Sequence, residues 1–347
     1  MKYRVFQWAS GTVGRHAATA VLRRGDWELV GLHTLTPAKV GRDVGELLGI
    51  EPLGIRATGD VDAVLGSDAD VVVHAPLASL VYGANEQQDV DDICRLLERG
   101  KNVITVVGYL HPKVHGAALV ERIEQACRRG NATFHSTGLN PGWMGDVLPL
   151  TMSALSRDIE RIVVREITNF EFYPSPEIMF AAMGFGSSVE RFERDGERRR
   201  RWLNGLFAES IQLVADGIGL ALDAIVDERE IATAPEPLQT AAGVVEHGTV
   251  AGQRWTWTGR AGGSARIVHE TVWRMHRSVA PQWPTGKHTV TIEGTPKIAL
   301  ALDGNWISDG LLATAMHAVN AIPQVCAAPP GIKTRLDLPG IYGRARR

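Results

Sequence analysis

The chain has 347 residues, a length typical of two domains at roughly 150 residues each. Its 37 Lys and Arg against 39 Asp and Glu give a formal net charge of −2, without the basic excess that nucleic-acid-binding or anionic-membrane proteins carry. Apolar residues at 44% and charged residues at 22% exclude a disordered chain and predict a globular protein with a substantial core.

Short β-rich runs alternate with longer helical patterns over the first 140 residues, as in a parallel sheet joined by crossover helices. Strands are expected over 4–8, 27–33, 69–74, 102–106 and 132–136, and helices over 13–24, 90–99 and 114–129. The nearly continuous apolar run at 69–74 is typical of a strand that is buried on both faces. The sequence therefore predicts an α/β fold, with a Rossmann doubly wound parallel sheet in a dinucleotide-binding domain over residues 1–145.

The second half changes to alternating apolar and polar residues, which favour antiparallel strands. Such alternation covers 160–172 and 288–302, two further strand-like runs lie between 248 and 275, and a long helical stretch covers 203–222. A last helix is expected over 310–321, ending at Pro323. These patterns predict an α+β domain over 146–305 with a mainly antiparallel sheet, followed by a C-terminal helix and tail over 306–347. The strand residues Trp255, Trp257 and Trp273 are expected to build a sheet core or an interface.

A glycine-containing turn lies between the first strand and the first helix, where backbone N–H groups and the helix dipole can hold a pyrophosphate. It lacks the first glycine of the GxGxxG pattern, where Ala9 stands. The alternative interpretation is a plain strand-to-helix turn that needs glycine for packing. The predicted cofactor-binding residues of this turn are Ser10, Gly11, Thr12, Val13 and Gly14.

The end of the second strand predicts which dinucleotide binds. An NAD-selective site usually has an acid there for the ribose hydroxyls, but this chain has none before Asp43. The hydroxyls of Thr34 and Thr36 and the cation of Lys39 suit a 2′-phosphate better. NADP is therefore the predicted cofactor, with NAD as a possible one.

Other candidate residues follow the carboxyl ends of the strands, where ligands gather in open α/β sheets. The expected cofactor contacts are Ala75, Pro76, Thr105, Val106 and Asn140, and the expected substrate contacts are Gly108, Asn140, Trp143 and Glu177. The alternative interpretation of Asn140 is a turn residue before Pro141. Glu177 lies in a predicted loop that either closes over the site or is a plain loop.

Three side chains are candidate catalytic residues, because hydride transfer to a carbonyl or iminium usually needs a proton donor. Tyr109 follows a strand end as a phenol donor, and Pro112 excludes a helix around it. His269 shares a largely apolar strand face, so the alternative is a hydrogen-bonded core histidine. Tyr173 precedes Glu177 in the same loop.

The segment Thr137-Gly138-Leu139-Asn140-Pro141-Gly142-Trp143-Met144-Gly145-Asp146-Val147-Leu148-Pro149 resembles the TG-x-NPG-x-x-x-D-x-LP signature of the dihydrodipicolinate-reductase-like superfamily, in particular its 2,4-diaminopentanoate dehydrogenase and native amine dehydrogenase branch. Residues 5–15, 100–105 and 318–323 extend the resemblance to nearly the whole chain. It implies that residues 146–305 form the substrate and dimerisation domain on an open antiparallel sheet, and that the last helix returns to the Rossmann domain. It also implies NAD(P)-dependent reduction of C=N or C=O by a homodimer.

Two departures from the resemblance affect the expected substrate. The chain has no His-His-rich motif of the true reductases, which argues against lysine biosynthesis. The glutamate that holds the amine or ammonia in amine dehydrogenases falls on Gly108.

The leading hypothesis is therefore an oxidoreductase that transfers a hydride between NADPH and a small carbonyl or imine compound. The alternatives are an amine dehydrogenase without the usual glutamate, and a non-catalytic NADP-binding or sensor protein. The expected partners are a small-molecule substrate and a second copy of the chain, with no nucleic acid and no membrane. The widely spaced Cys94, Cys127 and Cys326 predict a reducing cytoplasm and no metal site.

Overall fold

The structure is a computed structural model that describes residues 2–345, apart from the side chain of residue 308. The chain forms two compact units. One consists of Met1–Leu139 together with Leu311–Arg347, and the other of Asn140–Gly310. The sequence patterns placed the corresponding boundaries at 145 and 305.

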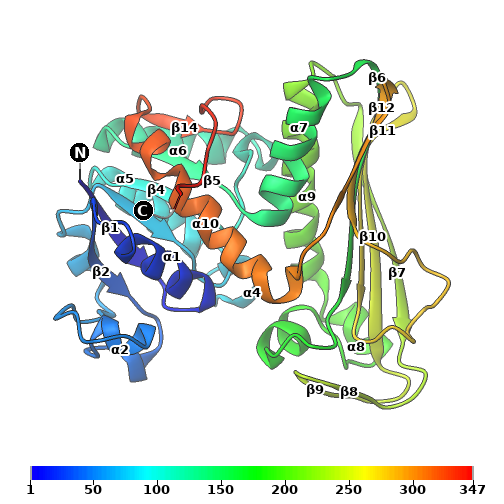
Figure 1. The fold of residues 1–347 in the computed structure, drawn as a ribbon, viewed down its shortest axis with the longest axis horizontal. Helices are drawn as coiled ribbons and strands as arrows, with labels where there is room; N and C mark the ends of the chain where they lie inside the picture. The colour runs from blue at the N-terminus through cyan, green and yellow to red at the C-terminus, as the bar shows by residue number, and fades with distance from the viewer. Residues whose placement is uncertain (1, 346–347) are drawn as a thin grey trace. The chain divides into compact units, whose positions relative to one another are not determined.

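The first unit contains a six-stranded sheet in the order β14-β5-β4-β3-β1-β2, with every pair of neighbours parallel (Figure 1). The predicted Rossmann sheet is thus confirmed. Its strands are β1 (Tyr3–Trp8), β2 (Trp27–His33), β3 (Val71–His74), β4 (Asn102–Thr105), β5 (Thr133–Ser136) and β14 (Gly331–Lys333). Its main helices are α1 (Thr12–Leu22), α2 (Val44–Leu48), α3 (Val61–Leu65), α4 (Ser79–Tyr82), α5 (Gln88–Glu98), α6 (Ala117–Gly130) and α10 (Trp306–Ala327).

Helices bury both faces of this sheet, which explains its nearly uninterrupted apolar strands. Val71 and Val73 of β3 share one core with residues of α1 and α10. Val72, between them in sequence, faces the other side and packs in a second core with residues of α5 and α6. Successive strand residues therefore serve two different cores.

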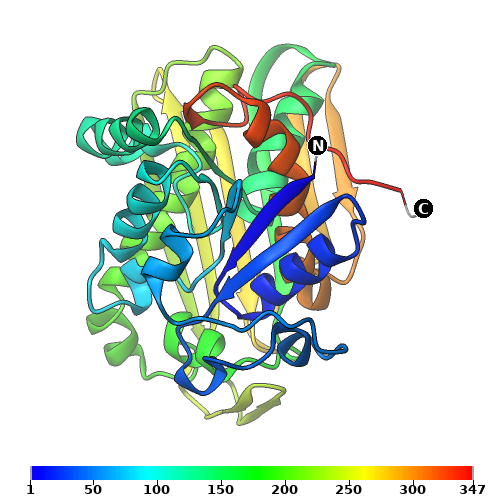
Figure 2. The same ribbon diagram turned by 90° about the vertical axis from the view of Figure 1, so that its left-hand side faces the viewer.

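The C-terminal helix α10 packs beside α1 in the first unit (Figure 2), as the family resemblance implied. The expectation that it ends at Pro323 is wrong, because it continues to Ala327. A proline inside a helix removes one hydrogen bond and crowds the preceding turn. Ile322 and Val325 are fully buried on either side of Pro323, and this packing holds the last turn in place.

The second unit contains a six-stranded sheet in the order β13-β12-β6-β11-β10-β7, in which only the β6–β11 pair is parallel. The mainly antiparallel sheet is therefore confirmed. Its strands are β6 (Arg157–Asn169), β7 (Ala224–Thr233), β10 (Val250–Ala261), β11 (Ser264–Arg274), β12 (His288–Thr295) and β13 (Ile298–Leu302), and a small hairpin is formed by β8 (Leu238–Thr240) and β9 (Gly243–Val245). Its α-helices are α7 (Leu148–Ser153), α8 (Val189–Arg194) and α9 (Glu197–Gly217).

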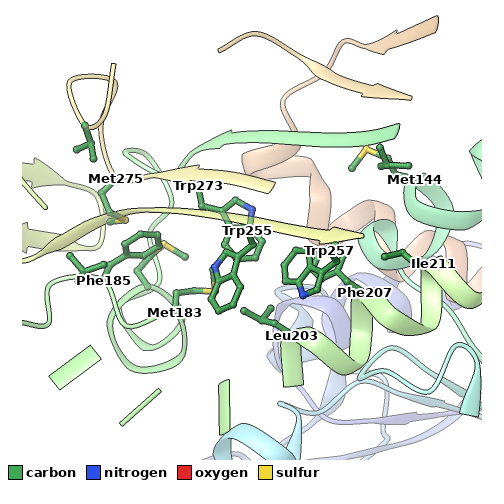
Figure 3. Packing of buried hydrophobic residues seen from close by; sticks show 14 of the residues in the cluster. Met144, Met183, Phe185, Leu203, Phe207, Ile211, Trp255, Trp257, Trp273 and Met275 are labelled. Carbon is green, nitrogen blue, oxygen red and sulfur yellow. The ribbon is translucent and has the colours of Figure 1, made fainter. Parts of the chain in front are cut away.

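Aromatic side chains fill the core between α9 and the sheet (Figure 3). Phe207 of α9 stacks on Trp257 with 3.8 Å between ring centroids, and Trp257 stacks in turn on Trp255. Trp273 joins the same core from β11. The expected role of the three strand tryptophans as a sheet core is confirmed, and the face that they cover is called the inner face of the sheet below.

Among the described residues, no helix is both long and apolar enough to cross a bilayer.

Candidate functional site

The turn between β1 and α1 has the backbone geometry of a dinucleotide-binding turn. Ala9, at the position of the missing first glycine, has a φ of 77°, a conformation that glycine adopts without strain. A Cβ on Gly14 would lie only 2.0 Å from the carbonyl oxygen of Ala9, so no other residue fits there. A Cβ on Gly11 would meet nothing within 4 Å.

The N-terminus of α1 is open to an anion. Gly11 is its N-cap, no side chain caps the first backbone N–H groups, and the first turn contains no acidic residue. Uncapped N–H groups at the positive end of a helix dipole bind phosphate groups. Gly14 therefore serves packing, as the plain-turn interpretation requires, while Gly11 leaves room for a pyrophosphate.

Polar side chains from this turn and from the segment after β2 lie close together. The hydroxyls of Ser10 and Thr34 lie 2.8 Å apart, and both side chains are buried. Lys39 Nζ donates to the carbonyl oxygen of Ser10 at 3.3 Å and lies 3.4 Å from its hydroxyl. The backbone N–H of Thr36 donates to the Thr34 hydroxyl. Within residues 2–345 the ammonium group of Lys39 has no carboxylate partner, so its charge is uncompensated.

The first acid after β2 is already used by the backbone. Asp43 caps α2, and its carboxylate accepts N–H groups of Gly45, Leu53 and Gly54 at 2.7–2.8 Å. These bonds, led by the one from Leu53, lower the pKa of Asp43. The carboxylate holds its own loop together and is not free to accept ribose hydroxyls.

The candidates at the ends of β3 and β4 are held by hydrogen bonds to neighbouring strands. Ala75, which precedes Pro76, donates its N–H to Trp8, and Val106 donates its N–H to the carbonyl of His74. The hydroxyl of Thr105 is fully buried and lies 2.9 Å from Nδ1 of His74. Burial lowers the pKa of His74 to about 3, so this imidazole is neutral.

Gly108 and Tyr109 form a strained corner after β4. Their φ angles are 129° and 68°, and the carbonyl of Gly108 accepts a 2.6 Å hydrogen bond from the hydroxyl of Ser136. Tyr109 lies edge-on to His115, and Pro112 begins the short helix η2 (Pro112–His115). A tyrosine in the left-handed region has a strained backbone, and strained positions cluster at functional sites. The backbone at position 108 adopts a conformation that favours glycine. The position that holds a glutamate in amine dehydrogenases therefore has no side chain in this protein.

The other candidates belong to the second unit. His269 of β11 is buried beside Phe207, neither ring nitrogen makes a hydrogen bond of normal geometry, and burial lowers its pKa to about 3. Trp143 is half-buried against the core of this unit. Tyr173 packs edge-on against Phe170, and burial raises the pKa of its phenol. The catalytic roles of Tyr109, His269 and Tyr173 stay predictions.

Glu177 does not lie in a loop as expected, because it begins a helical turn, η4 (Glu177–Ala182). Its carboxylate is exposed and accepts a hydrogen bond from the hydroxyl of Ser175, just before the turn. Met179 and Ala182, on the opposite side of the turn, are buried and explain why the segment is helical.

The structure adds one polar residue that the sequence patterns did not single out. Glu166 on β6 accepts hydrogen bonds from Nδ2 of Asn140 at 2.5 Å, from Nε1 of Trp273 at 2.8 Å and from the hydroxyl of Thr168 at 3.1 Å. Glu166 shares its side of the strand with the buried Val164. An acid on an otherwise apolar strand face is the signal that points to it.

No group of three or more His, Cys, Asp or Glu side chains in the described part of the chain is placed to hold a metal ion. The Rossmann sheet, the glycine turn and the open helix N-terminus together define a dinucleotide-binding protein.

Comparison with known proteins identifies the family. The 2,4-diaminopentanoate dehydrogenase C-terminal domain matches residues 143–344. An amine dehydrogenase of Streptomyces virginiae is 31% identical, over 96% of this chain and 95% of its own length. The 2,4-diaminopentanoate dehydrogenase of Acetoanaerobium sticklandii is 27% identical, over 97% of this chain and 94% of its own.

A solved structure of an amine dehydrogenase from Mycobacterium smegmatis shares the fold, with a TM-score of 0.80 at 23% identity over 99% of this chain and 97% of that one. The chain belongs to the family of 2,4-diaminopentanoate dehydrogenases and amine dehydrogenases, as the motif at 137–149 indicated. It is an NAD(P)-dependent oxidoreductase.

Proposed function

We propose that the protein transfers a hydride between NADPH and a small carbonyl or imine compound, with NADP preferred over NAD. The observation that carries the cofactor preference is the arrangement of Ser10, Thr34 and Lys39 beside the glycine turn. Two hydroxyls and an uncompensated ammonium group match a 2′-phosphate in both charge and hydrogen bonding. The engagement of Asp43 by three backbone N–H groups supports the same preference, because it removes the nearest acid that could select NAD.

The residues of the first unit fit the cofactor part by part. Uncapped N–H groups at the start of α1 would hold the pyrophosphate, and Gly11 leaves space for it to approach. The hydroxyls of Ser10, Thr34 and Thr36 and the charge of Lys39 would hold the 2′-phosphate. When bound, the cofactor supplies or accepts the hydride, and the protein's own task is to bind and orient its partner.

The candidate proton donors differ in what they can do at neutral pH. His269, with a pKa of about 3, is uncharged and could act only through a neutral imidazole N–H. Tyr109 would donate from its phenol. A second copy of the chain remains the expected partner of the protein.

Amine dehydrogenation is the second candidate function, because two relatives with nearly full-length similarity are an amine dehydrogenase and a 2,4-diaminopentanoate dehydrogenase. In the reverse direction of that reaction, reductive amination, a ketone and ammonia would be reduced together with NADPH in place of the simple carbonyl substrate. The absence of a carboxylate at Gly108 requires another group to hold the nitrogen.

Turnover separates these functions. NADPH oxidation is followed by the absorbance of the reduced nicotinamide, with small aliphatic ketones and aldehydes, each with and without ammonium chloride. We expect turnover with at least one of them. Turnover only with ammonium would assign the second candidate, and tight NADPH binding without any turnover would contradict both and favour a sensor.

A further inference from the structure

Glu166 is a carboxylate held by neutral donors alone. Its oxygens accept from the amide of Asn140, the indole N–H of Trp273 and the hydroxyl of Thr168. None of these groups carries a positive charge. Among the residues that the structure describes, Glu166 forms no ion pair, so its negative charge is oriented but not neutralised.

The charged groups around Glu166 do not compensate it. Arg165, its neighbour on β6, pairs with Glu270 of β11. His288 of β12 lies near Glu166 and accepts the N–H of Ile167 through Nδ1. Burial lowers the pKa of His288 more than the charge of Glu166 raises it, which leaves this imidazole neutral at neutral pH.

Three buried polar atoms around Asn140 and Glu166 have no hydrogen-bond partner. Since Asn140 gives its Nδ2 to Glu166, its Oδ1 is fixed as an acceptor, and this buried atom has no donor. The hydroxyl of Ser210 is also buried without a partner, and both atoms face Gly145, where a Cβ would lie 3.0 Å and 2.6 Å from them. Thr271 Oγ1, on the inner face of the sheet, is a third unpartnered oxygen. Buried polar atoms without a partner are costly unless a ligand or water forms hydrogen bonds with them.

We propose that Glu166, oriented by Asn140 and Trp273, binds the protonated nitrogen of an amine substrate. An ammonium or iminium group would supply the positive charge that pairs with the carboxylate. Its N–H groups could also donate to Asn140 Oδ1 and to the lone pairs of the two hydroxyls. Glu166 is half-buried, so it remains open to a ligand while the hydrogen bonds around it fix its direction. The inference rests on the proposed function and narrows its substrate class to primary amines and the imines derived from them.

The variant Glu166→Gln tests the charge with little change in shape. Asn140 can turn its amide over and present Oδ1 to the new amide, so the fold should survive. We expect kcat/KM for the oxidation of small primary amines (n-butylamine, 2-aminopentane, cyclohexylamine) with NADP⁺ to fall roughly 30-fold, mainly through KM, because a hydrogen bond to a charged group is lost. Glu166→Asp keeps the charge, so it should retain part of the kcat/KM that Glu166→Gln loses. NADPH affinity should not change.

Glu293→Gln is the matched control, because it removes a carboxylate from the same sheet that is paired with Arg161 at 3.0 Å. It should leave amine kinetics unaltered. A binding measurement without turnover adds a second readout: the alkylammonium salts should raise the melting temperature of the wild type but not that of Glu166→Gln.

The outcomes distinguish this inference from the proposed function. Equal amine kinetics and equal thermal shifts in wild type and Glu166→Gln would overturn the role of Glu166 and leave the oxidoreductase intact. If the protein reduces carbonyls but shows no amine oxidation, no response to ammonium and no thermal shift with alkylammonium salts, the role of Glu166 is also overturned. The proposed reduction of carbonyls would stand. Absence of turnover with every carbonyl and amine would overturn both.

Discussion

Lowering the pH from 7 to 5 should unfold the protein. Four buried histidines have pKa values far below the ordinary 6.5: about 3 for His74 and His269, and about 4 for His135 and His317. Burial is the main cause in each case, since it penalises the charged imidazolium. In the unfolded chain the same imidazoles accept a proton near pH 6.5.

The protein loses stability as the pH falls, because the pKa values of these histidines are lower in the folded state than in the unfolded chain. The unfolded state binds more protons as the pH drops below 6.5, so this contribution to stability is complete above that pH and is lost as the pH falls toward 4. At pH 5 each of these histidines lowers the free energy of unfolding by about 2 kcal/mol, and the four together lower it by on the order of 8 kcal/mol. The sum is comparable to the whole stability of a typical domain. Far-UV circular dichroism and tryptophan fluorescence against pH measure the transition.

Two variants test whether buried histidines cause the transition. His269→Leu fills the same apolar face without a titrating group, and should move the transition to lower pH. His247→Gln changes an exposed histidine and should leave it in place. An unfolding free energy that is constant between pH 7 and pH 5 would contradict the account.

Gly14→Ala should cost the protein about 3 kcal/mol of stability and most of its cofactor affinity. The added Cβ would lie 2.0 Å from the carbonyl oxygen of Ala9 and 2.9 Å from Nε2 of Gln7. The first of these atoms is backbone, so the glycine turn itself must move. Urea unfolding measures the loss of stability, and fluorescence titration with NADPH measures the loss of affinity.

Gly11→Ala is the matched control in the same turn. Its Cβ would meet nothing within 4 Å, and the φ of −70° suits alanine, so stability should stay within about 0.5 kcal/mol of the wild type. Cofactor affinity should nevertheless fall, because the methyl group occupies space that the pyrophosphate needs. Equal stability of the two variants would contradict the packing role of Gly14.

The sequence predicts the Rossmann unit well because its signals are local. The local signals include apolar runs, such as the one at 69–74, and glycines near the ends of helices, such as Gly100 and Gly130. Both can be recognised from neighbouring residues alone. The stretch 288–302 shows the limit of such signals. Its alternation continues across the turn of a hairpin, so the pattern does not show where β12 ends and β13 begins. The last helix was expected, but its continuation past Pro323 was not, because packing against residues distant in the sequence stabilises that turn.

The candidate site divides in the same way. The glycine turn and the absence of an acid before Asp43 are visible in the sequence, but the three hydrogen bonds that occupy Asp43 are not. The role of Glu166 could not be predicted from the sequence, because its partners Asn140 and Trp273 are 26 and 107 residues away along the chain. Only the paired strands β6 and β11 bring Trp273 to it.

The affinity of the protein for NADPH relative to NADH tests the account most directly. In a fluorescence titration we expect NADPH to bind at least about 30-fold more tightly, and Lys39→Ala to remove most of this difference by weakening NADPH alone. Equal affinities of the wild type for the two dinucleotides would contradict the assignment of Ser10, Thr34 and Lys39 to the 2′-phosphate.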